Sequence, residues 1–149
     1  KLKQAKVIIF SPGPGNPKNY PSTSKIYYQF KGKKKMIGIC LGFQQILFCE
    51  GAKIVEQNKI YHGYQSRVKV INKSSIFEKN KIFKVGRYHS LKLKEPFKIN
   101  DFDITMRCLD SKVAMAFENK KDKIYGFQFH PESFLTNNGN LLIKKILSS

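Results

Sequence analysis

Apolar residues in the first third of the chain form short continuous runs that alternate with a helical pattern. Val7 to Phe10 is a run of β-branched and aromatic residues, which is typical of a buried strand. Ser24 to Phe30 has the spacing of a short amphipathic helix, and Met36 to Ile39 is a second apolar run. Because a strand–helix–strand unit makes a right-handed crossover, this order predicts a parallel pair of strands.

A second helix and a set of short strands follow. From Leu41 to Cys49 the apolar residues recur at helical spacing, and Gly51 is a stop signal. Further strands are predicted at Lys53 to Gln57, Ser66 to Ile71, Ile82 to Val85, Ile104 to Arg107, Val113 to Phe117 and Lys123 to Phe129. The last two strands form a hairpin, and Leu141 to Leu147 forms a closing helix. The pattern predicts an α/β fold in one domain over residues 1–149.

Cys40 lies where the predicted strand at 36–39 meets the predicted helix at 41–49. Gly38 and Gly42 stand two residues before it and two after it. This is the nucleophile-elbow spacing of α/β-hydrolases, with Cys in place of Ser. The positive end of the helix favours the thiolate form of a cysteine placed there. A buried core thiol is the alternative interpretation, and this segment alone leaves both open.

The loop from Ser11 to Pro17 holds three prolines and two glycines in seven residues. Prolines stiffen the loop and glycines allow close backbone approach. It leaves the end of a predicted strand, where α/β folds bind their ligands. An ordinary connection is the alternative, although a connection rarely needs this much rigidity.

A thiol nucleophile needs a base, and the base needs a group that orients it. Histidine occurs only at His62, His89 and His130. His130 ends an apolar strand, and Glu132 follows two residues after it. Pro131 has no backbone N–H to donate to a neighbouring strand, so strand pairing stops there. Both side chains can project from the same end of the sheet, so this histidine is the candidate base.

The formal net charge of +18 would suit a nucleic-acid partner. Arginine, however, occurs only at Arg67, Arg87 and Arg107, and the lysines are spread along the whole chain. Proteins that recognise DNA bases mostly use arginine, and proteins that bind along the phosphate backbone have their positive charges clustered on one surface. We therefore expect a solvated lysine surface and no nucleic-acid partner.

No apolar run is long enough to cross a membrane. The three cysteines have no metal-ligand spacing and indicate reduced thiols.

Four motifs occur in an order that resembles the class I (triad) glutamine amidotransferases. They are Ser11-Pro12-Gly13-Pro14-Gly15, Gly38-Ile39-Cys40-Leu41-Gly42-Phe43-Gln44, Arg87-Tyr88-His89-Ser90-Leu91 and Gly126-Phe127-Gln128-Phe129-His130-Pro131-Glu132-Ser133. The resemblance is greatest to the small subunit of anthranilate synthase and the amidotransferase subunit of aminodeoxychorismate synthase. It implies a flavodoxin-like three-layer fold, with a mostly parallel central sheet flanked by helices and a small antiparallel subsheet.

The resemblance also implies a role for each matching residue. Cys40 attacks the side-chain amide of glutamine, His130 transfers protons and Glu132 orients His130. The backbone N–H groups of Leu41 and Gly13 form the oxyanion hole. The glutamine-binding positions that match are Gly13, Pro14, Gly15, Gln44, Ser90 and Leu91.

Ammonia is then expected to pass to a large chorismate-binding synthase subunit (component I), which also switches the glutaminase on. The resemblance implies no cofactor or metal in this subunit, and Mg²⁺ in the partner. The expected location is the cytoplasm, or the plastid stroma for an organelle-encoded protein.

Two departures from the family pattern stand out. Phe43 occupies a position where the family usually has histidine, so we expect catalysis to survive and a partner-facing or supporting contact to change. The family's opening strand–helix–strand block, roughly thirty residues, has no counterpart. We therefore expect an N-terminally truncated domain with an exposed apolar strand edge, and poor stability or activity when it is expressed alone.

Four alternatives stay open at this point. The acceptor reaction can be anthranilate synthesis for tryptophan or aminodeoxychorismate synthesis for folate. The chain can belong to another amidotransferase branch or be a related cysteine hydrolase. It can be a catalytically silent regulatory fragment. A nucleic-acid-binding module is supported by charge alone.

Overall fold

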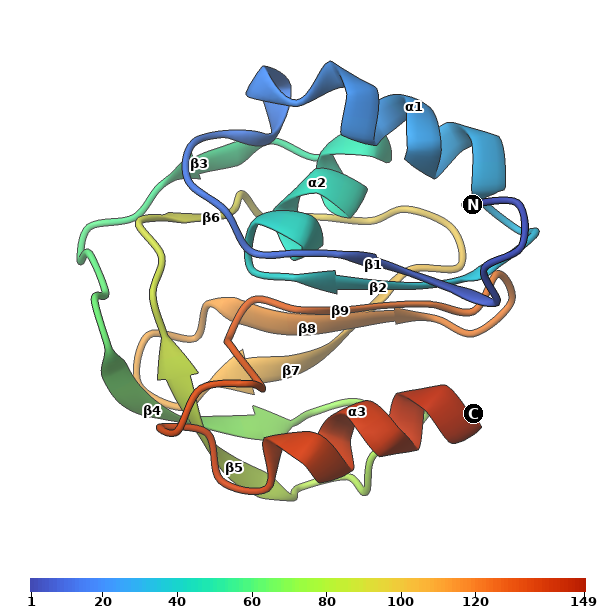
Figure 1. The fold of residues 1–149 in the computed structure, drawn as a ribbon. Helices are drawn as coiled ribbons and strands as arrows, with labels where there is room; N and C mark the ends of the chain where they lie inside the picture. The colour runs from blue at the N-terminus through green and yellow to red at the C-terminus, as the bar shows by residue number, and fades with distance from the viewer.

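In the computed structural model, which describes residues 1–149, a curled seven-stranded sheet lies between two layers of helices (Figure 1). The strands of this sheet are β1 (Val7–Phe10), β2 (Lys35–Ile39), β4 (Tyr64–Val70), β5 (Ile82–Arg87), β7 (Asp103–Cys108), β8 (Ala114–Asn119) and β9 (Ile124–Phe127), in the order β1-β2-β9-β8-β7-β4-β5. A separate two-stranded sheet pairs β3 (Ile54–Glu56) with β6 (Leu91–Leu93). The helices are α1 (Pro21–Phe30), α2 (Leu41–Cys49) and α3 (Gly139–Ser148), with a short 3₁₀ turn at Pro17–Asn19.

The predicted parallel pair is confirmed, because β1 pairs with β2 in parallel and β2 pairs with β9 in parallel. The predicted hairpin is also confirmed as the antiparallel pair β8–β9. The α/β class with flanking helices and a small antiparallel sheet is therefore confirmed. The large sheet is less parallel than predicted, because β8, β7, β4 and β5 all pair antiparallel within it.

Element boundaries differ from prediction at three places. Helix α1 begins at Pro21, three residues before the predicted start at Ser24, because proline suits the first turn of a helix. Strand β5 extends two residues beyond the predicted end at Val85 and ends at Arg87. Strand β9 ends at Phe127, and the chain beyond it reaches His130, which forms an isolated bridge with Gly86 of β5.

The core fills both faces of the sheet. Helices α1 and α2 cover one face, where Ile46 and Phe117 are fully buried. Helix α3 covers the other face, where Leu142 and Ile146 pack with Phe127. Strand β8 is buried at every position, as expected for a strand covered on both sides. No helix in the structure has the length and apolar character needed to span a bilayer.

Phe43 lies inside this core. Its ring is fully buried, and its centroid is 5.3 Å from that of Phe117. The contact that differs from the family pattern is therefore a supporting contact within the domain, and the partner-facing alternative is wrong.

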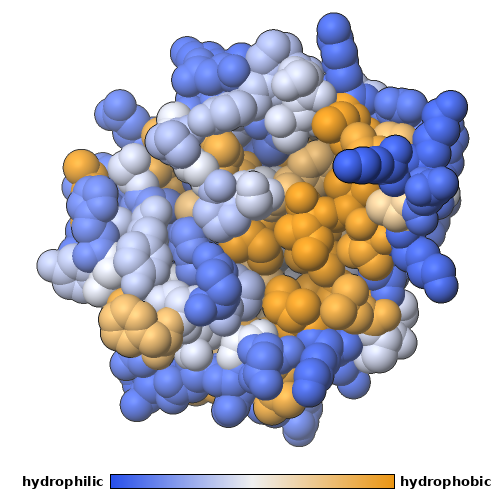
Figure 2. Space-filling model, viewed as in Figure 1, coloured by the Kyte–Doolittle hydropathy of each residue, from blue (hydrophilic) through white to orange (hydrophobic).

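The expected exposed apolar edge is present at β1. This strand is the first in the sheet order, with β2 as its one neighbour, and Ile9 on it is 59% exposed. Figure 2 shows apolar side chains gathered over this part of the sheet. Unpaired apolar edges are sites at which a strand of another chain can add.

Replacing Phe117 by alanine is expected to lower the free energy of unfolding by about 3–5 kcal/mol, because it removes a buried ring between Phe43 and Phe102. Urea unfolding followed by circular dichroism measures the loss. Phe134→Ala is the matched control, since this side chain is 89% exposed and its removal should change stability by less than about 0.5 kcal/mol. Equal losses in the two variants would contradict the assigned core.

Candidate active site

Cys40 occupies a strained turn between β2 and α2. Its backbone has φ 53° and ψ −102°, a region that residues other than glycine rarely adopt. A Cβ atom at Gly42 would lie 2.0 Å from the carbonyl oxygen of Phe10, and one at Gly38 would lie 2.5 Å from the carbonyl oxygen of Gly42. Both neighbours must therefore be glycine for the chain to turn here, and the predicted strand–elbow–helix geometry is confirmed.

A cavity of about 130 Å³ opens beside this turn. Its lining residues come from four separated segments and are Gly13, Pro14, Gly15, Cys40, Leu41, Gln44, His62, Tyr88, His89, Ser90 and Leu91. All six residues predicted to bind glutamine are among them. The cavity is smaller than the roughly 300–1,000 Å³ of pockets for drug-sized ligands, so it suits a small substrate.

The two predicted oxyanion-hole residues lie next to each other. A Cβ atom built on Gly13 would be 3.0 Å from Cδ2 of Leu41. The backbone N–H of Leu41 interacts with the Cys40 sulfur and favours its thiolate form. Gly15 has φ +85°, so the proline-rich loop needs glycine there to turn toward the cavity.

His130 and Glu132 form the predicted pair. Nδ1 of His130 lies 2.5 Å from Oε1 of Glu132, and pairing with a carboxylate places the proton on Nδ1. Nε2 of His130 is then the basic nitrogen, and it is buried with no hydrogen-bond partner. The backbone N–H of His130 donates to the Gly86 carbonyl at 3.0 Å, which fixes the residue against β5.

Tyr88 lies between the sulfur and the imidazole. Its carbonyl oxygen is 3.9 Å from Sγ of Cys40, and its ring packs edge-on against His130 with centroids 5.0 Å apart. Cys40 and His130 therefore face the same end of the sheet and share a neighbour. No hydrogen bond joins Sγ of Cys40 directly to His130.

Gln128 belongs to the site and was missed by the sequence reasoning. Its amide nitrogen lies 3.7 Å from Sγ of Cys40, and its amide oxygen accepts from Nε2 of Gln44 at 3.0 Å. Gln44 also donates to the Leu91 carbonyl at 3.3 Å. The available signal was a single polar residue inside the apolar run from 124 to 129. Gln128 is fully buried, so this network connects the sulfur to the cavity wall without solvent.

A second buried cluster shapes the segment from 88 to 91. Nε of Arg87 donates to Nε2 of His89 at 3.0 Å, and Nδ1 of His89 donates to the Leu91 carbonyl at 2.8 Å. Gln57 donates to the His89 carbonyl at 2.6 Å, and the Arg87 guanidinium stacks on the ring of Tyr61 at 3.6 Å. Burial, followed by the charge of Arg87, lowers the pKa of His89 to about 4. His89 is therefore neutral near pH 7 and acts as a structural residue.

Burial raises the pKa of the Cys40 thiol to about 11. Donation from the Leu41 N–H and the Gln128 amide lowers it, and the Glu132 carboxylate raises it further. The predicted effect of the helix terminus is thus present, but burial outweighs it. The resting thiol is protonated, and its reaction as a nucleophile needs a base.

The three cysteines are free thiols, as predicted. No group of three or more His, Cys, Asp or Glu side chains lies close enough together to hold a metal ion.

Residues 1–148 match the family described as "Glutamine amidotransferase class-I". The chain belongs to this family and is a glutamine amidotransferase. It is 40% identical to anthranilate synthase component 2 of Lactococcus lactis, over 98% of this chain and 74% of that protein. It is 35% identical to anthranilate synthase component 2 of Helicobacter pylori, over 93% of this chain and 70% of that protein.

Solved structures share the fold at low sequence identity. The structure of PurLQS from Thermotoga maritima has a TM-score of 0.79 at 18% identity, with 99% of this chain and 81% of that chain covered. A glutamine amidotransferase from Thermotoga maritima has a TM-score of 0.74 at 18% identity, with 89% and 58% covered. At this identity the likeness establishes the fold.

Lowering the pH from 7 to 5 is expected to destabilise the fold through His89. Its pKa is about 4 in the folded protein and about 6.5 in the unfolded chain, so the unfolded chain takes up the proton first and stability falls between those values. The expected contribution at pH 5 is about 1–2 kcal/mol, measured by urea unfolding at both pH values. His89→Gln should reduce the pH dependence by this amount. The same pH dependence in the variant would rule out His89 as its source.

Alkylation of Cys40 by iodoacetamide is expected to rise by about tenfold per pH unit from pH 7 to about pH 10, because only the thiolate reacts and its pKa is about 11. Mass spectrometry of the peptide that carries Cys40 measures the rate. A rate that levels off near pH 8 would show that the resting protein stabilises the thiolate, contrary to the burial argument.

Proposed function

We propose that this chain hydrolyses L-glutamine with Cys40 as nucleophile, His130 as general base and acid, and Glu132 as the residue that orients His130. The chemistry needs no cofactor in this chain, because a thiol, an imidazole and a carboxylate supply the nucleophile, the base and the orientation. One arrangement carries the proposal. The strained turn at Cys40 opens on a small cavity, and Tyr88 contacts both Cys40 and the imidazole of His130, which pairs with Glu132.

In the first half-reaction, Nε2 of His130 takes the thiol proton while Sγ of Cys40 attacks the side-chain amide carbon of glutamine. The carbon–sulfur bond forms, and the amide oxygen becomes an oxyanion held by the N–H groups of Leu41 and Gly13. The tetrahedral intermediate then collapses as His130 gives its proton to the departing nitrogen. Ammonia leaves, and a glutamyl thioester remains on Cys40.

In the second half-reaction, His130 activates a water molecule that attacks the thioester. The carbon–sulfur bond breaks, the thiol regains its proton and glutamate is released. One oxyanion-hole donor contributes on the order of 10² to 10³ in rate. The high pKa of Cys40 supports a mechanism in which the proton moves to His130 during attack, because the resting thiolate is scarce.

The ammonia is proposed to pass to a large chorismate-binding synthase subunit that contains Mg²⁺ and forms anthranilate. The names of the curated relatives, anthranilate synthase component 2, support this acceptor. The aminodeoxychorismate branch uses the same half-reaction and differs in the product of the partner, so product identification separates the two.

Cys40→Ala is expected to reduce glutamine-dependent anthranilate formation by at least about 10³-fold and to leave the ammonia-dependent reaction unchanged, when assayed with an anthranilate synthase component 1 partner. The reason is that only the glutamine reaction needs the sulfur. Product fluorescence measures both rates.

Cys49→Ala is the matched control, because this cysteine ends α2 and does not line the cavity. It should keep both reactions. Loss of both reactions in Cys40→Ala, or of neither, would falsify the assigned role of Cys40. Formation of aminodeoxychorismate with its own synthase partner, and no anthranilate, would instead overturn the proposed acceptor.

A further inference from the structure

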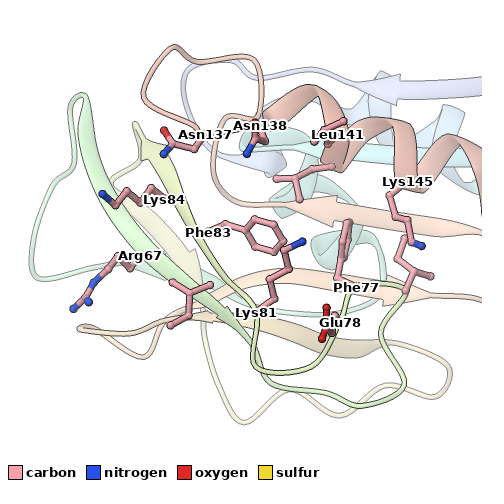
Figure 3. A pocket seen from close by; sticks show the side chains of 13 residues that line it. Arg67, Phe77, Glu78, Lys81, Phe83, Lys84, Asn137, Asn138, Leu141 and Lys145 are labelled. Carbon is pink, nitrogen blue, oxygen red and sulfur yellow. The ribbon is translucent and has the colours of Figure 1, made fainter.

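The hollow between β5 and α3, of about 590 Å³, does not bring its charged groups together (Figure 3). Nζ of Lys81 lies over the ring of Phe83, 5.5 Å from its centroid. Lys84 points away from Phe83, because successive side chains of a strand face opposite sides of the sheet. Polar groups do converge around Cys40, where the buried amides of Gln44 and Gln128 form a chain of hydrogen bonds that ends at the sulfur.

Gln128 points to the side of the sheet where α2 begins. Its neighbours in the sequence, Phe127 and Phe129, stack with centroids 4.7 Å apart and belong to the core beneath α3. Side chains alternate along an extended chain, so Gln128 faces the opposite side, where it meets Gln44 of α2. Its backbone N–H donates to the Met115 carbonyl at 2.9 Å, which fixes the segment against β8. A fully buried amide costs free energy unless it is hydrogen-bonded, so its partners indicate what it does.

A carbonyl group at the far end of this chain of hydrogen bonds fixes the orientation of the Gln128 amide. The Leu91 carbonyl can only accept, so the amide nitrogen of Gln44 faces it at 3.3 Å. The same nitrogen donates to Gln128 at 3.0 Å, so Gln128 presents its oxygen to Gln44. The nitrogen of Gln128 therefore faces Sγ of Cys40, 3.7 Å away, and acts as a hydrogen-bond donor to the sulfur.

The hydrogen bond from Gln128 becomes stronger when the thiol loses its proton. In the resting site the Sγ–H group of Cys40 donates to the Tyr88 carbonyl at 3.9 Å, and this contact is lost with the proton. The Gln128 donor remains and faces a negatively charged sulfur, and hydrogen bonds to ionised groups are the stronger ones. Burial raises the pKa of the Cys40 thiol, whereas donation from the Leu41 N–H and the Gln128 amide lowers it. An interaction that strengthens toward the transition state accelerates the chemical step.

We propose that Gln128 is a further catalytic residue, whose side-chain N–H stabilises the thiolate of Cys40 as it forms in each half-reaction. This role rests on the proposed hydrolysis of glutamine. As His130 takes the thiol proton, the Gln128 N–H holds the negative sulfur until its electron pair forms the bond to the amide carbon. When the carbon–sulfur bond breaks, the electron pair returns to the sulfur, and the same N–H holds it until His130 gives the proton back. Gln128 keeps its own protons throughout.

Gln128→Met keeps the size of the side chain and removes the donor. Alkylation of Cys40 by iodoacetamide at pH 9 should fall at least about threefold, because the thiol pKa rises and the greater nucleophilicity of a more basic thiolate offsets only part of the loss. The kcat for glutamine hydrolysis, assayed with an anthranilate synthase component 1 partner, should fall about tenfold.

Gln45→Met is the matched control. It removes an equally buried amide of α2, which donates to Oγ of Ser24 at 2.7 Å and does not contact the sulfur. It should change the alkylation of Cys40 less than about twofold. Unchanged alkylation in Gln128→Met, or an equal fall in the two variants, would overturn the role of Gln128.

Gln128→Glu tests the donor without removing the acceptor that Gln44 uses. At pH 9 the carboxylate cannot donate, so alkylation should fall at least as much as in Gln128→Met, while the KM for glutamine changes less than about threefold. A raised KM with unchanged kcat and unchanged alkylation would show that Gln128 only supports Gln44, and would overturn the proposal.

Alkylation needs no glutamine, so the failure of this proposal differs from the failure of the proposed function. Absence of glutaminase activity in the unaltered chain with its partner would overturn the proposed function and this role with it. Unchanged alkylation in the Gln128 variants of an active glutaminase would overturn the role of Gln128 alone.

Discussion

The close approach of the first turn of α2 to the end of β1 is the constraint on which the site depends. There is no room for a side chain at Gly42, because the Phe10 carbonyl occupies that space. The turn forces Cys40 into a backbone conformation that costs about 1–3 kcal/mol, and the hydrogen bond from its N–H to the Phe127 carbonyl at 2.8 Å helps to hold it. The same contact brings the loop after β1 beside the sulfur and so creates the cavity.

Burial decides the chemistry of the groups around that turn. It raises the pKa of Cys40 and lowers that of His89, so both are neutral near pH 7. Arg87 is fully buried without a carboxylate partner, and burial lowers its pKa too. Cys40 and His89 therefore carry no charge at rest, and ionisation of the Cys40 thiol needs a base that takes its proton.

The parts of this picture that were predictable from sequence are local in the chain. The elbow follows from glycines at 38 and 42, and the His130–Glu132 pair follows from two residues at a strand end. Gln128 and the Arg87–His89 cluster were not predictable in the same way. Their contacts depend on which strands, far apart in the sequence, lie beside one another in the fold. The sequence also does not distinguish a buried glutamine from an exposed one. The added antiparallel strands of the large sheet have the same cause.

The bridge between Gly86 and His130 has a consequence for the shape of the whole sheet. In strand order, β9 is third and β5 is last, yet the chain leaving β9 returns to β5 and draws the far edge back toward the centre. This bridge thus holds the curl of the sheet seen in Figure 1 at the end of the sheet where His130 lies. A slight flattening of the curl would move His130 away from Cys40 with every pair of named strands intact, so the proposed catalytic arrangement depends on the curl of the sheet as well as on its strand pairing.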